Sequence, residues 1–88
     1  MLFELGKVVA TPRALELMEG AGVSPAFLLK RHASGDWGEV SPEVAKENDH
    51  SLVHGFRVIS CYPVGDGAVW VVTEASRGFT TMLLPEEY

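Results

Sequence analysis

The stretch FRVISCYPVGDGAVWVVTEASRGFTTMLLP, residues 56–85, decides the fold of this chain. It holds three runs of β-branched and aromatic residues, divided by the turn signals Gly65-Asp66-Gly67 and Ser76-Arg77-Gly78. These runs predict strands over 56–64, 68–75 and 79–85. Because connections this short join antiparallel neighbours, we expect a three-stranded meander, to which FELGKVVA, residues 3–10, adds a short fourth strand.

Upstream of the strands, a hydroxyl residue precedes a proline at three places: Thr11-Pro12, Ser24-Pro25 and Ser41-Pro42. The hydroxyl suits an N-cap and the proline suits the first helical position, so the sequence predicts helices over 12–19, 25–33 and 42–53. We therefore expect an α+β fold in one domain, residues 1–88. Three short N-terminal helices pack on one face of a C-terminal antiparallel sheet of three to four strands.

Size and cysteine content narrow the class of protein. The 88 residues suit one small domain, and the lone Cys61 excludes an internal disulfide and is interpreted as a buried, inert thiol. The opening MLFELGKVVATP lacks the basic segment and apolar run of a signal peptide, and no stretch has the roughly 20 apolar residues of a membrane span. We expect a cytoplasmic protein without membrane attachment.

The chain is acidic, with 12 Asp and Glu against 7 Lys and Arg and a net charge of −5. Duplex backbones are bound by an excess of basic residues, so nucleic acid is an unfavoured partner. An acidic surface instead suits a basic groove on another protein, where charge complementarity speeds and orients encounter.

The segment HASGDWGEV, residues 32–40, has three interpretations. In the first it is only a junction between helices, where Gly35 ends the helix, His32 favours its negative end, Asp36 stabilises a turn and Trp37 covers a gap in the core. In the second, Trp37 is an exposed anchor for a partner, with Asp36 beside it. In the third, His32 is catalytic.

Metal and phosphate sites have weak signals. His50 and His54 share a helix face at a spacing that suits two ligands, but a third ligand is missing, so we expect no metal. The glycines of VGDGAV precede a strand and not a helix, which favours a hairpin turn over a phosphate loop. We expect no cofactor.

A polar set from the strands and turns also has two interpretations. In one, Thr and Tyr form ordinary cross-strand pairs, and Arg77 and Glu74 flank a turn. In the other, the set forms a ribonuclease-like cleft in which an arginine steadies phosphate charge and a histidine or glutamate moves protons.

Two resemblances to known families follow from these motifs. The pattern SGDWG, WVVTEA and TTMLLPEEY resembles a family of short bacterial proteins found on plasmids and other mobile elements, over nearly the whole chain. That resemblance implies an accessory protein of a mobile element. The order of helices and meander is also similar to ribonuclease toxins of the barnase and RelE type, which implies catalytic positions at His32, Arg57, Glu74, Arg77 and Thr81.

Taken together, these observations favour a non-enzymatic accessory protein of a mobile element that binds, and inhibits, a host or defence-system protein. The expected contact residues are Asp36, Trp37, Glu39, Glu86 and Glu87. A ribonuclease-like protein that binds or cleaves RNA is the first alternative. A homodimeric structural subunit, joined through an exposed sheet edge, is the second.

Overall fold

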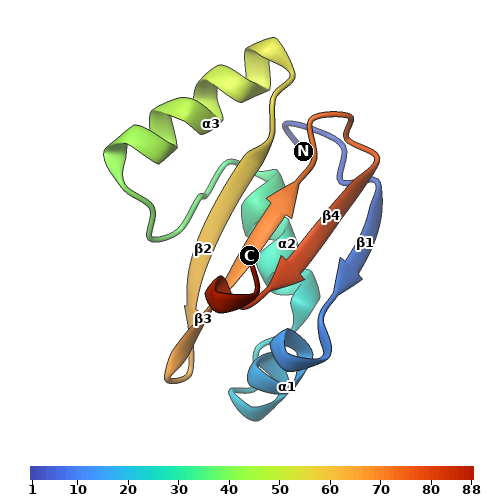
Figure 1. The fold of residues 1–88 in the computed structure, drawn as a ribbon, viewed down its shortest axis with the longest axis vertical. Helices are drawn as coiled ribbons and strands as arrows, with labels where there is room; N and C mark the ends of the chain where they lie inside the picture. Colours follow the sequence, from blue (N-terminus) through green and yellow to red (C-terminus); the bar gives the residue numbers. More distant parts are fainter.

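The computed structural model describes residues 1–88 and shows an α+β fold, as predicted (Figure 1). The elements in chain order are β1 (Lys7–Ala10), α1 (Pro12–Gly20), α2 (Pro25–Ala33), α3 (Pro42–His54), β2 (Val58–Val64), β3 (Gly67–Thr73), β4 (Phe79–Leu83) and the short 3₁₀ helix η1 (Pro85–Glu87).

All three helices begin where the sequence predicts. Thr11, Ser24 and Ser41 have extended backbones, and each side-chain oxygen accepts a hydrogen bond from the amide three residues on, at 3.1, 3.1 and 3.2 Å. A proline follows each cap, where its missing amide costs nothing. These helix starts are therefore set by local chemistry.

The sheet has the order β1-β4-β3-β2. The meander β2-β3-β4 is antiparallel as predicted, but β1 pairs in parallel with β4, so the sheet is mixed. Most of the chain lies between β1 and β4, and a connection of that length allows a parallel neighbour. The parallel pairing is anchored by backbone hydrogen bonds from Lys7 to Gly78 and from Thr11 to Met82, both 3.0 Å.

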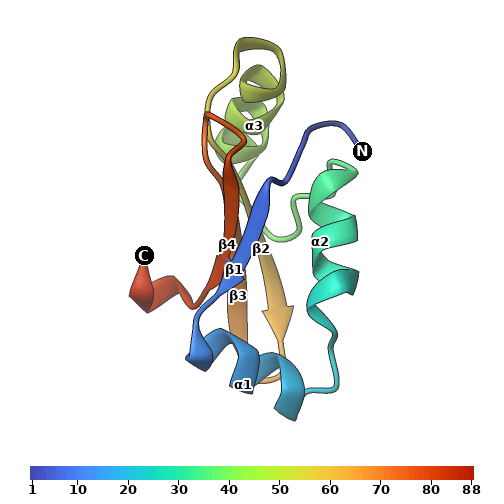
Figure 2. The same cartoon turned by 90° about the vertical axis from the view of Figure 1, so that its right-hand side faces the viewer.

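One face of the sheet is covered by α1 and α2 (Figure 2). The core between these layers contains the buried Ala14, Met18 and Leu28 of the helices and the strand residues Tyr62 and Val71. The opposite face of the sheet, which is toward the viewer in Figure 1, has no α-helix over it and is crossed only by η1 near the C-terminus.

The third helix covers an edge of the sheet. In α3 the buried side chains are Asn48 and Ser51, not an apolar stripe. The Asn48 side chain donates to the Ile59 carbonyl at 2.8 Å and accepts from the Ile59 amide at 3.0 Å, so it pairs with the outer edge of β2 as a neighbouring strand would.

The rest of the β2 edge is closed by the loop before α3. Cys61 donates its amide to the Trp37 carbonyl at 3.0 Å and accepts from the Glu39 amide at 2.7 Å, and Pro63 has no amide to leave unpaired. Gly38, at φ 74°, allows this approach, since a Cβ there would collide with the Cys61 carbonyl.

None of the helices has the length and apolarity that crossing a membrane requires.

Replacing Asn48 tests the pairing of α3 with the β2 edge. We expect Asn48→Ala to lower the free energy of unfolding by about 2 kcal/mol, because it removes both partners of the Ile59 backbone. Urea unfolding followed by circular dichroism measures the change. Lys46→Ala, at an exposed position of the same helix, is the control. Equal stability of the two variants would contradict the pairing.

Candidate protein interface

His32 lies in the last turn of α2, as predicted, but its side chain points into the core and is fully buried. Nδ1 is 2.5 Å from the Ser60 hydroxyl and Nε2 is 2.9 Å from the Thr73 hydroxyl. Thr73 in turn bonds Thr80 at 2.7 Å, and Thr80 donates to the Leu5 carbonyl at 2.7 Å. The network therefore joins α2 to β2, β3, β4 and the N-terminal segment.

The direction of these hydrogen bonds assigns the tautomer of His32. Because Thr80 donates to a carbonyl, it accepts from Thr73, and Thr73 accepts from Nε2–H. Nδ1 is then the acceptor for the Ser60 hydroxyl, and the ring is neutral. Burial lowers the pKa of His32 to about 4, and the charge of Arg77 adds to that effect.

This neutral ring corrects two interpretations of His32. It carries no charge with which to stabilise the negative end of α2. It also offers no access for a substrate, because His32 and Ser60 are both fully buried. The histidine is thus a core group whose ring nitrogens are both satisfied.

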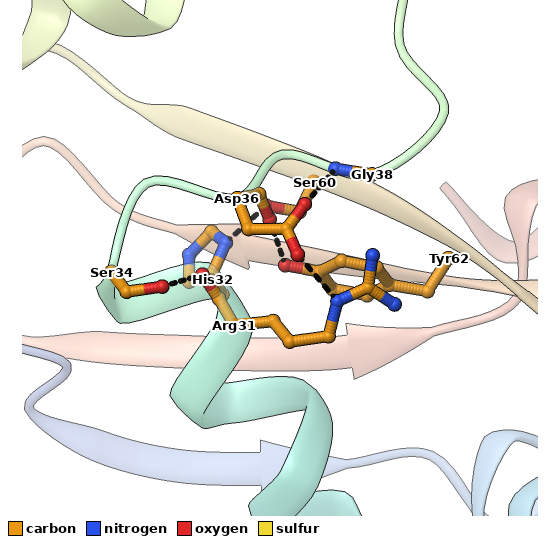
Figure 3. Close-up of polar contacts among 7 residues, drawn as sticks. All are labelled: Arg31, His32, Ser34, Asp36, Gly38, Ser60 and Tyr62. Atoms are coloured by element: carbon orange, nitrogen blue, oxygen red, sulfur yellow. Dashed lines mark hydrogen bonds and ion pairs between the residues drawn. The ribbon is translucent and has the colours of Figure 1, made fainter.

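The loop after α2 is held by three side chains (Figure 3). Arg31 lies over the Tyr62 ring, 4.5 Å from its centroid, and pairs with the Asp36 carboxylate at 2.6 Å. Asp36 also accepts from the Gly38 amide at 3.2 Å, as expected of a turn aspartate, and its carbonyl accepts from the Tyr62 hydroxyl at 2.5 Å. The hydrogen bond from Arg31 lowers the pKa of Asp36.

Trp37 is not the exposed anchor that the second interpretation requires. It is 8% exposed and packs between Phe3 and His32, at ring-centroid distances of 6.2 and 5.9 Å. Its indole nitrogen donates to Asp49 at 3.4 Å. Phe3, near the N-terminus, completes this cluster, so Trp37 covers the core as the first interpretation predicts. HASGDWGEV is therefore a rigid junction between α2 and α3.

The residues of the ribonuclease-like set do not form a cleft. His32 is buried on the helix-covered face, whereas Thr81 lies on the opposite face and the Arg57 guanidinium stacks 5.4 Å from the Tyr88 ring centroid. The Arg77 guanidinium donates to the carbonyls of Phe56, Ser51 and Glu74, at 2.7, 3.2 and 3.0 Å, so it ties turns together. Arg77 and Glu74 flank a turn, as the structural interpretation predicts.

The two predicted acidic contacts at the C-terminus have internal partners. Glu86 forms an exposed ion pair with Arg13 at 3.1 Å. Glu87 accepts from the Leu84 amide at 2.8 Å and from the Thr11 hydroxyl at 2.7 Å, and these hydrogen bonds lower its pKa. Both glutamates help to hold η1 against the N-terminus of α1.

The two histidine rings of α3 lie close together and are tilted by 33°. The His50 and His54 rings are 4.1 Å apart, and His50 lies 5.8 Å from the Phe56 ring in a parallel arrangement. No three His, Cys, Asp or Glu side chains come together in a way that could hold a metal ion.

The uncovered face of the sheet has the most apolar surface without a partner. Strand alternation places Ile59, Cys61, Trp70 and Phe79 on this face. Phe79 is 45% exposed, and Ile59, Cys61 and Trp70 are each half-buried. Val72 and Leu83 lie on the same face and are buried, and Val44 of α3 lies beside Ile59. The exposed parts of Phe79, Ile59, Cys61 and Trp70 are the apolar surface that another molecule can contact.

Two adjacent hollows lie beside α3 at this face, and both are lined by Val44 and Ile59. One extends past Glu39 to Cys61 and Trp70, and the other passes Glu47, Asn48 and His50 to Phe56 and Arg57. Tyr88 stands beside Trp70, at a centroid distance of 5.2 Å. We call the residues that line the two hollows the sheet groove.

Of the predicted contact residues, only Glu39 lines the sheet groove. The contact residues predicted from the sequence did not include Val44, Ile59 and Trp70, which also line it. The available signal was in the strands, because Val69 and Val71 fix one face as core and so place Trp70 on the other. A strand that is apolar on both faces indicates either a second layer of the domain or a partner.

Burial raises the pKa of the Cys61 thiol. The thiol is therefore protonated and weakly nucleophilic at neutral pH. Cys61 is half-buried rather than buried, and it forms part of the groove lining.

No family model, curated protein or solved structure matched the chain. The resemblance to plasmid-related proteins remains a prediction.

His32 predicts a dependence of stability on pH. The pKa of His32 is lower in the folded chain than the ordinary value of 6.5, so between pH 6.5 and 4 the unfolded chain binds more protons. Stability is therefore lost as the pH falls through this range. We expect the free energy of unfolding to drop by about 2 kcal/mol between pH 7 and pH 5.

Urea unfolding at the two pH values measures this drop, and NMR of the imidazole resonances identifies the residue responsible. The double variant His50→Gln/His54→Gln is the control and should keep the full dependence. A drop that disappears in the double variant would assign the effect to α3 and contradict the neutral His32.

Proposed function

We propose that the protein is a non-enzymatic binding module that engages another protein through the sheet groove. One observation carries this proposal: a sheet face with the half-buried Ile59, Cys61 and Trp70 along a hollow has no α-helix over it. Half-exposed aromatic residues in a hollow are the usual anchors of protein interfaces.

The charges around the sheet groove indicate the chemistry of the partner. Glu39 and Glu47 are exposed on the α3 side, and the whole chain has a net charge of −5. Arg57 is the one basic residue of the lining, and it is stacked on Tyr88. A segment with apolar side chains and basic flanks fits this surface, because its lysines and arginines would meet the glutamates.

The resemblance to plasmid-related proteins supplies a biological setting for this binding. A small acidic accessory protein of a mobile element would bind a host or defence-system protein and block a basic surface on it. The absence of a shared cleft for His32, Arg57, Glu74 and Arg77 favours this function over RNA cleavage.

Affinity purification from the chain's own host tests the proposal. The tagged protein is compared with the variant Glu39→Lys/Glu47→Lys, which reverses the charge of the groove rim. We expect a stoichiometric protein partner with the natural chain and at least a roughly tenfold weaker interaction with the variant.

The matched control is Glu16→Lys/Glu19→Lys, which makes the same charge change on exposed residues of α1, on the other side of the sheet. It should keep the partner. Equal loss in both variants would show that total charge and not the sheet groove controls binding. Recovery of RNA without protein would overturn the proposal in favour of the ribonuclease-like alternative.

Cys61 offers a second readout, because it is the only cysteine and it lines the sheet groove. We expect its labelling by a maleimide to slow several-fold when the purified partner is added. The free chain unfolded in urea gives the unprotected rate. An unchanged rate with saturating partner would place the interface elsewhere.

A further inference from the structure

The two edges of the sheet are treated differently by the rest of the chain. The β2 edge is closed by Asn48, by the loop of residues 37–39 and by Pro63. The β1 edge is open, and Figure 2 looks directly onto it with no other element in front. Val8 and Val9 are 41% and 39% exposed there. Unpaired strand edges are templates for pairing with another strand.

The backbone of β1 defines which groups are free. The amides of Lys7 and Thr11 point to β4, where they bond Gly78 and Met82. Strand alternation therefore turns the amides and carbonyls of Val8 and Ala10 outward. Thr11 is also extended, at φ −72° and ψ 152°, whereas Gly6, at φ 66°, bends the chain away. The usable extended stretch is thus residues 7–11.

We propose that the chain forms a homodimer by antiparallel pairing of β1 with β1 of a second copy, with the two-fold axis at Val9. This register uses the full extended stretch. It pairs Val8 of one copy with Ala10 of the other through their outward amides and carbonyls, twice by symmetry. Val9 faces Val9 of the partner across the axis as a non-hydrogen-bonded pair.

Charge complementarity supports a second copy as the occupant. In this register Lys7 of each copy lies opposite Thr11 of the other, on the uncovered face of the sheet. Thr11 donates to the Glu87 carboxylate at 2.7 Å, while Arg13 neutralises Glu86. The Glu87 carboxylate beside Thr11 therefore has no cationic partner within its own copy. In the dimer, the Lys7 ammonium of the other copy would lie near it and pair with it.

A register shifted by one residue would have neither the full set of backbone hydrogen bonds nor the contact between Lys7 and Glu87. With the axis at Val8, Lys7 would lie opposite Val9, and the outward groups of Ala10 would need the bent Gly6 as their partner. The pairing would then lose hydrogen bonds at both ends. Symmetry about Val9 is the arrangement that satisfies backbone and charge together.

Sedimentation equilibrium of the purified full chain tests the dimer. We expect a mass that rises from the 9.6 kDa of one chain to twice that value between micromolar and millimolar concentration. Val8→Pro should lower the association at least roughly tenfold, because it removes an outward amide without touching the bonds to β4. Val8→Thr keeps that amide and should associate as the natural chain does. A monomer throughout this range would overturn the proposal.

Disulfide trapping tests the register and does not depend on how well Val8→Pro folds. In a Cys61→Ser background, Val9→Cys places two thiols on the axis at about 4.5 Å between Cα atoms, within disulfide range. It should cross-link rapidly on mild oxidation. Lys7→Cys lies opposite Thr11 and should cross-link far more slowly. Equal rates for the two variants would overturn the assigned register and the edge pairing with it.

Discussion

A neutral imidazole ties α2 to three strands of the sheet and to the N-terminal segment. His32 bonds Ser60 of β2 and Thr73 of β3, and Thr73 continues through Thr80 of β4 to the N-terminal segment. Each group in this chain is buried, and each has a partner, which is the condition under which a polar core is tolerated. The same arrangement excludes catalysis by His32 as the chain is folded here, because a buried group that is fully satisfied leaves no route for a substrate.

The position of His32 also determines which face of the sheet has no α-helix packed on it. The network fixes α2, and with it the layer shared with α1, on one face of the sheet. The remaining helix is used to close the β2 edge through Asn48. With no further α-helix in the chain, the opposite face leaves Ile59, Trp70 and Phe79 partly exposed. A domain this small has too few helices to cover both faces and both edges of its sheet. The sheet groove lies on the face that no α-helix covers.

Features encoded within a few residues were predicted correctly, and features that need distant partners were not. Helix caps and hairpin turns act over a few residues, so the helix starts at Thr11, Ser24 and Ser41 and the antiparallel meander could be predicted. Burial of Trp37 was only one of two open interpretations, because it depends on Phe3 as well as on the nearby His32. The parallel pairing of β1 was not predicted, because it depends on a strand near the other end of the chain. The pairing of Asn48 with β2 was not predicted, because its partner is the backbone of a strand edge and not a side chain.

The proposed interface and the proposed dimer combine into one surface. Pairing at β1 gives the strand order β2-β3-β4-β1-β1-β4-β3-β2, and the two-fold axis keeps both uncovered faces on the same side. Seven strand spacings separate the two outer strands, which places the two sheet grooves roughly 30 Å apart. A partner with two or more copies of the recognised segment would then be bound twice, and its apparent affinity would exceed that of a single groove. Modest contacts in each groove would suffice for tight binding, which suits a chain whose single groove is short and half-exposed.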